Sequence, residues 1–282
     1  MKRKILTTST SCLDYINHSE DIDTIRIKVD INGKLYEDGT DITAEDFYSM
    51  LSKDNNFIPK TTQPSIGQLL EKFEDYSKQG YTDLFITTIS SKMSGTYNTI
   101  RQCSEILKDT INIYVYDTYT VNYNEGTFAL TAAKMFREGK TLEEVCSRLD
   151  YLKEHNTILF AVDDLAYLVK NGRLSGAAGF VGKYLKIKPL LEVCPDGTIQ
   201  VMENIRTTKK ALRKVCDKAK EYTKDHTNFT LIITYTGVKL KDYFITILNE
   251  NGINDFILSP CTPIVGCHVG PDAIGLGIFI ND

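Results

Sequence analysis

The chain has 282 residues, of which 42% are hydrophobic and 25% are charged, and its formal net charge at pH 7 is -4. This composition is ordinary for a globular protein, and a slightly acidic chain has no overall basic field to attract nucleic acid or an anionic membrane. The N-terminus carries the charges of a signal peptide without its apolar core, and no stretch approaches the ~20 apolar residues of a membrane-spanning helix. We therefore expect a soluble cytoplasmic protein that does not bind nucleic acid.

Cysteine and histidine usage argues against a disulfide-bonded or metal-binding protein. The seven cysteines are odd in number, no two have C-x-x-C spacing, and the four histidines are not paired at a spacing typical of metal ligands. A disulfide framework or a zinc site is therefore not expected, and most of the cysteines are interpreted as small buried apolar residues. We expect no metal and no cofactor.

The first half of the chain alternates between strand-like and helix-like segments. Strands are predicted at residues 4–8, 25–31, 84–89 and 113–116, and Asn32-Gly33 predicts a hairpin turn after the second of them. Helices are predicted at residues 44–52 with Thr43 as N-cap, from Pro64 to Gly80, from Ser94 onwards, and near 124–138 and 141–154. This alternation indicates an α/β domain with a parallel sheet and helices on its faces.

The second half mixes hairpins with helices. Strands are predicted at residues 159–162, 188–193, 199–201, 230–234, 256–258 and 275–280, with Asp196-Gly197 as a hairpin turn. Helices are predicted at residues 164–170 and near 207–224 and 239–250. This pattern indicates a two-layer α/β domain, and we place the boundary between an N-terminal domain, 1–156, and a C-terminal domain, 157–282.

Several motif-like segments do not meet the requirements of the chemistry they suggest. The glycine-rich run 176–184 is one residue too long for a P-loop, and Tyr184 replaces the hydroxyl that would hold magnesium. Gly275-Leu276-Gly277 lacks the third glycine of a dinucleotide-binding turn. Cys267 and His268 would point to opposite faces of an extended backbone, so they would not form a thiol–imidazole pair.

Three segments place hydroxyls or a polar ring in predicted turns. Thr61 and Thr62 precede a predicted helix, Ser94 lies where a buried strand passes into the next helix, and His268 lies between glycines. Strand ends in open α/β sheets bind ligands, and helix N-termini favour anions. Helix capping by the hydroxyls and a structural role for the histidine are the competing interpretations; together the segments suggest an anion pocket.

The sequence resembles the DegV family, which includes the fatty-acid-binding subunit of bacterial fatty acid kinase. The resemblance runs from residue 4 to residue 280 and rests on short motifs in a shared order. They are Thr7-Thr8-Ser9-Thr10-Ser11-Cys12-Leu13, Thr61-Thr62-Gln63-Pro64-Ser65, Ile89-Ser90-Ser91-Lys92-Met93-Ser94-Gly95-Thr96-Tyr97, Gly172-Arg173-Leu174-Ser175, Lys186-Ile187-Lys188-Pro189, Arg206-Thr207-Thr208-Lys209-Lys210-Ala211-Leu212 and His268-Val269-Gly270-Pro271.

The resemblance implies a two-domain DegV-like fold and a carrier that is not itself an enzyme. It implies one long-chain fatty acid, whose tail lies in an apolar tunnel and whose carboxylate is bound by hydroxyls in the Thr61-Thr62 motif and at Ser94, with His268 beside it. The carrier would present this lipid to a separate ATP-dependent fatty acid kinase subunit, with at most transient contact with a membrane surface. We assign partner docking to Arg173 and Arg206.

Departures from the family pattern leave alternatives open. Thr8 and Cys12 stand where the pattern has aspartates, and Asp272 stands where a glycine is usual. We expect the first two to remove acidic groups near the edge of the sheet, and Asp272 to add negative charge near the head-group site. The alternatives are a small-molecule hydrolase or transferase that uses Ser94 or Cys267, and a lipid sensor without kinase coupling.

Overall fold

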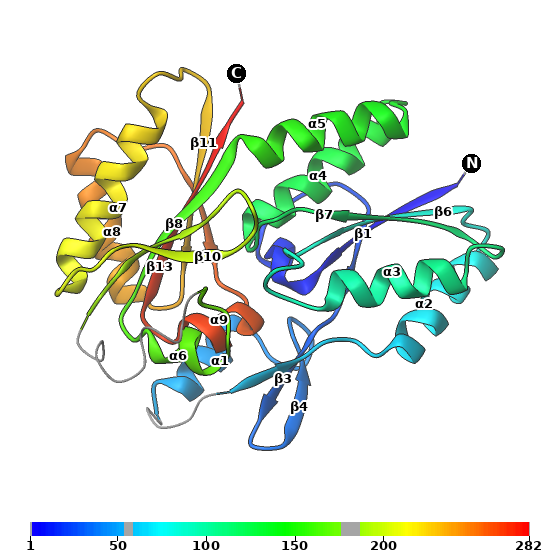
Figure 1. Cartoon of the computed structure of the whole chain (residues 1–282), viewed down its shortest axis with the longest axis horizontal. Helices are drawn as coiled ribbons and strands as arrows, with labels where there is room; N and C mark the ends of the chain where they lie inside the picture. The colour runs from blue at the N-terminus through cyan, green and yellow to red at the C-terminus, as the bar shows by residue number, and fades with distance from the viewer. Residues whose placement is uncertain (1, 54–58, 176–186, 282) are drawn as a thin grey trace.

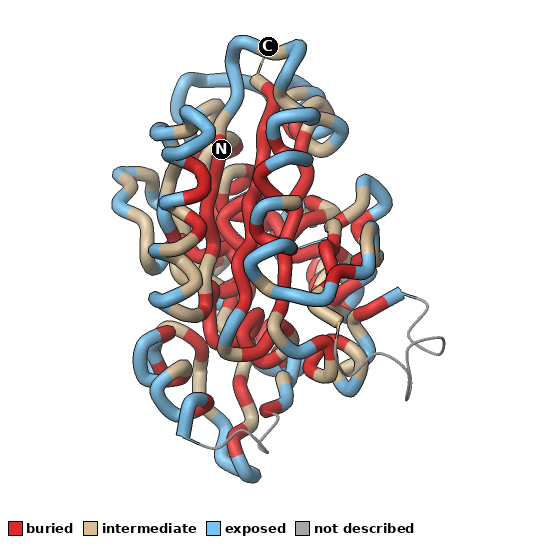
Figure 2. Tube along the Cα trace, turned by 90° about the vertical axis from the view of Figure 1, so that its left-hand side faces the viewer, coloured by how far each residue is buried: buried red, intermediate tan, exposed pale blue. Residues whose placement is uncertain are grey.

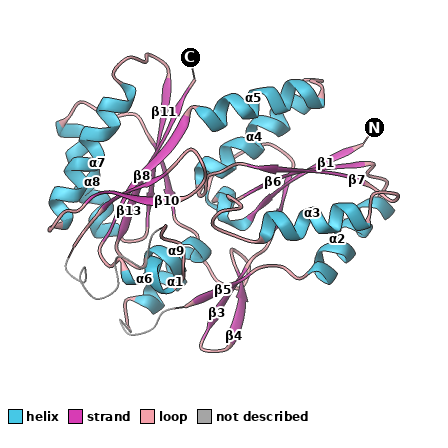
Figure 3. Ribbon diagram, in the orientation of Figure 1, coloured by secondary structure: helices cyan, strands magenta, loops and turns pink. Residues whose placement is uncertain are grey.

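The computed structural model describes residues 2–53, 59–175 and 187–281. They form three sheets with helices packed around them (Figures 1 and 3). The P-loop-like run 176–184 lies outside the described residues. In the part of the chain that is described, no helix combines the length and the apolar character needed to cross a bilayer.

The first sheet is parallel and has the strand order β2-β1-β6-β7. Its strands are β1 (Arg3–Thr8), β2 (Ile22–Ile25), β6 (Asp83–Thr88) and β7 (Asn112–Asp117). Successive strand residues face opposite sides: Leu6 and Ile86 pack against α2 (Ile66–Lys78) and α3 (Thr96–Ile106), whereas Ile5 and Phe85 pack against α4 (Tyr123–Arg137) and α5 (Leu142–Glu154). The predicted parallel sheet with helices on its faces is confirmed.

The second sheet has six strands in the order β10-β9-β8-β13-β11-β12, antiparallel except for the last pair. Its strands are β8 (Asn156–Val162), β9 (Leu190–Val193), β10 (Ile199–Glu203), β11 (Phe229–Tyr235), β12 (Ile257–Pro260) and β13 (Ala273–Ile280). Helices α7 (Thr208–Thr223) and α8 (Val238–Glu250) cover one face. The central strands are buried along their length (Figure 2) because the opposite face turns towards the rest of the molecule.

A small antiparallel sheet, of which sequence reasoning anticipated only the Asn32-Gly33 hairpin, adjoins these two. It consists of β3 (Lys28–Ile31), β4 (Lys34–Glu37) and β5 (Lys60–Thr62) in the order β4-β3-β5. The single strand predicted at 25–31 is wrong, because the chain leaves the parallel sheet at Ile25 and enters the small sheet at Lys28 while the apolar alternation continues. The predicted Asn32-Gly33 hairpin is confirmed.

Two helices pack against the small sheet, one from each half of the sequence. They are α1 (Ala44–Leu51), capped by Thr43 as predicted, and α9 (Pro263–Val269). Helix α6 (Ala166–Lys170) lies against α9 (Figure 1). Because α9 comes from the second half of the chain, the proposed division at residue 156 cuts through this packing, although β8 does begin at Asn156. The division stays a prediction.

Candidate ligand-binding site

A cavity of about 310 Å³ lies where the three sheets meet. Since β1, β6 and β7 are parallel, their carboxyl ends meet at one edge, and the loops that follow them bring Thr10, Ser94 and Asn122 to the cavity. Strand β5 adds Thr61 and Thr62 from another direction. The cavity therefore lies at the edge of the parallel sheet where ligands are expected in an open α/β fold.

Most of the remaining wall is apolar. It is lined by residues that include Ile158, Phe160, Leu168, Val193, Val265 and Ile274. These residues belong to three strands and two helices of the second half of the chain, β8, β9, β13, α6 and α9, and all six are buried. A hydrocarbon group entering this space would therefore leave water for an apolar environment.

His268 and Thr61 are in contact in the polar part of the cavity. The Oγ1 of Thr61 is 3.1 Å from the Nε2 of His268. The Nδ1 of His268 is buried and has no hydrogen-bond partner among the described residues. Burial, together with the positive charge of Arg173, lowers the pKa of His268 to about 3. The imidazole is therefore neutral near pH 7.

The glycine-flanked turn predicted around His268 is wrong, because the segment is helix α9, with His268 in its last turn. Gly266 lies inside this helix, where an added Cβ would be 2.5 Å from the Oη of Tyr48. The glycine is thus explained by the close approach of α1. Only Gly270, with φ 81°, has the left-handed backbone that ends the helix.

Ser94 and the Thr61-Thr62 segment line the same cavity. The Oγ of Ser94 is 2.9 Å from the Oγ1 of Thr96 and accepts a hydrogen bond from the Thr96 backbone N–H at 3.2 Å. Thr61 and Thr62 lie in β5, and the N-cap of α2 is Ser65, so Pro64 precedes the helix instead of starting it. Thr61, Thr62, Ser94 and His268 thus converge on one cavity; that they bind a ligand stays a prediction.

The two arginines assigned to partner docking lie in different surroundings. Arg173 lines the cavity, where its Nε donates to the carbonyl oxygen of Met93 at 3.1 Å and a second N–H donates to that of Asn171. Burial lowers the pKa of Arg173, and within residues 2–53, 59–175 and 187–281 it forms no ion pair. Arg206 is exposed just before α7 and does not line the cavity.

Cys267 is not arranged as a nucleophile. It is buried in α9, and its thiol lies 3.9 Å from the carbonyl oxygen of Lys60, whereas the neighbouring His268 contacts Thr61. Burial raises the pKa of Cys267 well above its ordinary value. The two side chains diverge because they are successive residues of a helix, so the extended backbone assumed from the sequence is wrong. All seven cysteines are free.

A buried carboxylate compensates for the missing aspartate at position 8. Thr8 ends β1, so it lies at the carboxyl edge of the parallel sheet, the edge at which the cavity lies. The Thr8 hydroxyl and the Thr10 hydroxyl both donate to the carboxylate of Glu125 on α4. Burial raises the pKa of Glu125 to about 8, although the threonine hydrogen bonds oppose the rise. The acidic group is therefore supplied from another element.

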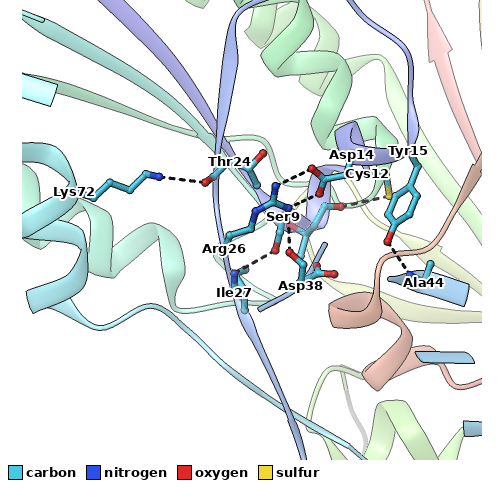
Figure 4. Close-up of polar contacts among 11 residues, drawn as sticks. Ser9, Cys12, Asp14, Tyr15, Thr24, Arg26, Ile27, Asp38, Ala44 and Lys72 are labelled. Carbon is cyan, nitrogen blue, oxygen red and sulfur yellow. Dashed lines mark hydrogen bonds and ion pairs between the residues drawn. The ribbon is translucent and has the colours of Figure 1, made fainter. Parts of the chain in front are cut away.

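Polar contacts around Cys12 hold the opening segment against the small sheet (Figure 4). Cys12 is buried with a left-handed backbone, φ 60°. Arg26 donates to both carboxylate oxygens of Asp14 and, at 3.0 Å, to the carbonyl oxygen of Asp38. The Asp38 side chain is buried beside this network, and burial raises its pKa to about 8. An acidic residue is thus present here as well.

Asp272 does not line the cavity, so the expected negative charge at the head-group site is not found. Its backbone carbonyl accepts from the N–H of Asp163 at 2.8 Å, and its carboxylate lies beside Gly237. Burial, together with the charge of Asp163, raises the pKa of Asp272. The aspartate that replaces the usual glycine is therefore in contact with the residue that follows β8, away from the cavity wall.

Sequence reasoning missed five polar residues of the cavity wall. They are Thr10, Gln63, Asn122, Thr234 and Cys261. Asn122 follows a parallel strand just as Ser94 does, so the same strand-end argument applies to it. No local sequence signal indicated Thr234 or Cys261, which lie within or just after strands of the six-stranded sheet. The described residues contain no group of three or more His, Cys, Asp or Glu side chains placed to hold a metal ion.

Comparison with known proteins identifies the family. A family model described as "Uncharacterised protein, DegV family" matches residues 2–281. DegV domain-containing proteins of Staphylococcus aureus and Listeria monocytogenes are 32% and 31% identical to this chain, and each match covers 98% of this chain and 97% of the relative.

Comparison with solved structures agrees with this family assignment. A fatty acid binding DegV family protein from Streptococcus agalactiae matches with a TM-score of 0.89 at 27% identity and covers 100% of both chains. A stearic acid-binding protein from Eubacterium ventriosum matches with a TM-score of 0.86 at 26% identity, covering 99% of this chain and 98% of that one. The chain therefore belongs to the DegV family.

Proposed function

We propose that this protein binds one long-chain fatty acid in the cavity and carries it to a separate kinase, without catalysing a reaction itself. The observation that carries the proposal is a single cavity with a hydroxyl and imidazole cluster on one side and an apolar wall on the other. The solved relatives from Streptococcus agalactiae and Eubacterium ventriosum, which are described as fatty acid-binding and stearic acid-binding, support it.

The head group would be a carboxylate held by Thr61, Ser94 and His268. A buried carboxylate without hydrogen-bond donors is very costly, whereas hydrogen bonds to an ionised acceptor are strong. The two hydroxyls each supply a donor, and the neutral imidazole supplies one when Nε2 or Nδ1 carries the proton. Thr62 adds a further hydroxyl-bearing residue to this side of the cavity. We further propose that Arg173, which lines the same cavity, supplies the compensating positive charge.

Phosphoryl transfer requires a partner, since no nucleotide-binding loop was recognised in the sequence. The resemblance to the fatty-acid-binding subunit of a kinase implies an ATP-dependent partner, and Arg206 is exposed and available to contact one. Arg173 would then have two roles: it would bind the carboxylate and lie close to the partner. A hydrolase or transferase is not favoured, because Cys267 is buried with a raised pKa and Ser94 is paired with Thr96.

Mass spectrometry of the lipid released from purified, denatured protein tests the proposal most directly. A fatty acid in about equimolar amount is expected. The same preparation, with the lipid removed, should bind octadecanoic acid and should not hydrolyse an ester probe. An empty protein that turns over the ester, with activity lost in Ser94→Ala or Cys267→Ala, would establish an enzyme instead.

A further inference from the structure

The cavity has a second polar site, away from the proposed carboxylate site. Its residues are Asn122, Thr234 and Cys261, which we call the inner polar site. All three are more than nine-tenths buried. They lie among apolar lining residues such as Ile158 and Ile274, where a polar group without a partner is costly. An explanation is therefore needed for polar groups at this position.

Asn122 has an unpartnered donor at this site. Its Oδ1 lies 3.7 Å from the thiol of Cys261 and 3.8 Å from the thiol of Cys12, which can both donate to it. Within the described parts of the chain, the Cys261 sulfur is the one group near enough to accept from its Nδ2, which carries two N–H groups. The residue is 6% exposed and lines the cavity, so the second N–H is available to a ligand there.

The backbone of Asn122 is also unusual. Its φ is 60° and its ψ is -152°, a combination that glycine adopts readily and other residues rarely do. Such strain costs on the order of 1–3 kcal/mol and persists where the surroundings or a function require the side chain. A glycine at this position would relieve the strain and remove the amide, so the presence of asparagine points to a use for its side chain.

Thr234 supplies a hydroxyl beside the amide, and Gly275 keeps the space next to it open. A Cβ on Gly275 would be 2.7 Å from the Oγ1 of Thr234, and both residues line the cavity. Burial raises the pKa of Cys261 to about 12, while the Thr234 hydroxyl and the Asn122 side chain oppose the rise. The first glycine of Gly275-Leu276-Gly277 therefore has a role unrelated to nucleotides.

Helix α9 gives the separation of the two polar sites. His268 lies in its last turn, and Cys261 lies two residues before its first residue. The five residues of helical rise from Pro263 to His268 correspond to about 7.5 Å, and the two residues before the helix add at most about 7 Å. An extended chain advances ~1.2 Å per bond, since three bonds span about 3.3–3.6 Å. A group at the inner polar site would therefore be roughly six to twelve carbons from a carboxylate beside His268.

We propose that the inner polar site recognises a hydroxyl group in the middle of a fatty acid chain, so that the preferred ligand is a mid-chain hydroxylated acid. An Asn122 N–H would donate a hydrogen bond to the hydroxyl oxygen, and Thr234 Oγ1 would accept a hydrogen bond from the hydroxyl group. This proposal rests on the proposed fatty acid binding and goes further by naming the substrate class.

The test compares three acids on the lipid-free, full-length protein. They are octadecanoic acid and its derivatives with a hydroxyl on the tenth or on the third carbon. Affinities are measured for the wild type, for Thr234→Val, which keeps the shape and removes the hydroxyl, and for Asn122→Gly, which removes the amide and relieves the backbone. Thr120→Val is the matched control, because Thr120 has a buried, unpartnered hydroxyl in the same loop as Asn122 but does not line the cavity.

The wild type should bind the tenth-carbon hydroxy acid at least as tightly as octadecanoic acid. Thr234→Val and Asn122→Gly should weaken only that ligand, by about tenfold, and Thr120→Val should leave the order of the three ligands unchanged. Equal losses for all three acids, or no preference between the tenth and third carbons, would overturn the proposal while leaving fatty acid binding intact. Failure of the wild type to bind any of the acids would overturn the proposed function itself.

Discussion

The Oγ1 of Thr61 lies 3.1 Å from the Nε2 of His268, although 207 residues separate them in the sequence. Pairing of β5 with β3 sets Thr61 opposite Val29, and α9 packs on the same small sheet. The contact therefore depends on two segments from opposite halves of the chain. It joins a hydroxyl to a neutral imidazole at the cavity wall, so the two donors that we propose for the carboxylate are both uncharged.

Replacement of His268 by glutamine should remove part of the pH dependence of stability. The folded-state pKa is about 3 and the ordinary value is 6.5. Above pH 6.5 the residue is neutral in both states; as the pH falls from 6.5 towards 3, only the unfolded chain binds the proton, so stability is lost. The loss is ~1.4 kcal/mol per pH unit, or about 2 kcal/mol at pH 5.

Urea unfolding of the wild type and His268→Gln at pH 5 and pH 7.5 measures this difference. The difference between their free energies of unfolding should change by about 2 kcal/mol in favour of the variant at the lower pH. His226→Gln is the control, since His226 lies in the loop after α7 and does not line the cavity. A gap for His268→Gln that does not change with pH would contradict the buried, neutral imidazole.

Ser94→Ala and Thr61→Val should weaken binding of a fatty acid more than binding of its methyl ester. Each substitution removes a hydrogen bond to a charged oxygen, worth about 1.5–3 kcal/mol, and the ester is the weaker acceptor. Calorimetric titration of both ligands checks the difference. Ser104→Ala in the C-terminal part of α3 is the control, because among the described residues its hydroxyl donates only to the carbonyl oxygen of Arg101. Equal losses for acid and ester would favour a purely structural role.

Glu125→Gln should stabilise the protein as the pH rises. Burial raises the folded-state pKa of Glu125 from 4.5 to about 8. Between these values the unfolded chain releases a proton that the folded chain retains, so the wild type loses stability with increasing pH and the glutamine variant does not. The free energy of unfolding of the variant, relative to wild type, should increase from pH 5 to pH 8. Glu105→Gln on the exposed face of α3 should show no such trend.

The layers of the fold were predictable because packing imposes local periodicity. Leu6 and Ile86 face one helical layer and Ile5 and Phe85 the other, so the buried strands read as continuous apolar runs between amphipathic helices. The small sheet was not predictable in this way. Alternation runs unbroken from Ile25 to Ile31, and only contacts distant in sequence decide that the chain changes sheets within it.

The site was predictable only where strand order alone determines position. Ser94 follows a central parallel strand, so its place at the ligand-binding edge follows from topology. His268 was recognised as a site residue through the family resemblance, yet its helical conformation was missed because Gly266 reads as a turn residue when the packing of Tyr48 is unknown. Thr234 gave no signal, because a threonine inside a strand is ordinary.

Shortening the fatty acid should weaken binding in proportion to the apolar surface it loses. Each buried methylene contributes about 0.8 kcal/mol, so removal of two carbons should cost roughly 1.6 kcal/mol, or somewhat more than tenfold in affinity. Titration with saturated acids of decreasing length measures the slope. Affinities that do not depend on length, in the range shorter than the cavity, would contradict an enclosed apolar site for the tail.

Arg206→Ala should separate lipid binding from phosphorylation. Arg206 is exposed and lies outside the cavity wall, so its loss should leave fatty acid affinity at the wild-type value. Formation of acyl phosphate with the partner kinase and ATP should fall, because the planar guanidinium can bind acidic groups or a phosphate in a way that alanine cannot. His268→Gln should impair both steps.

The control is Arg137→Ala at the last turn of α4, a surface arginine paired with Glu20 and about 20 Å along the helix from Asn122. Lipid binding and phosphorylation are measured on the same preparations. Phosphorylation of lipid bound to Arg206→Ala at the wild-type rate would remove this residue from the docking surface, and a wild-type protein whose lipid no kinase accepts would be a storage or sensing protein.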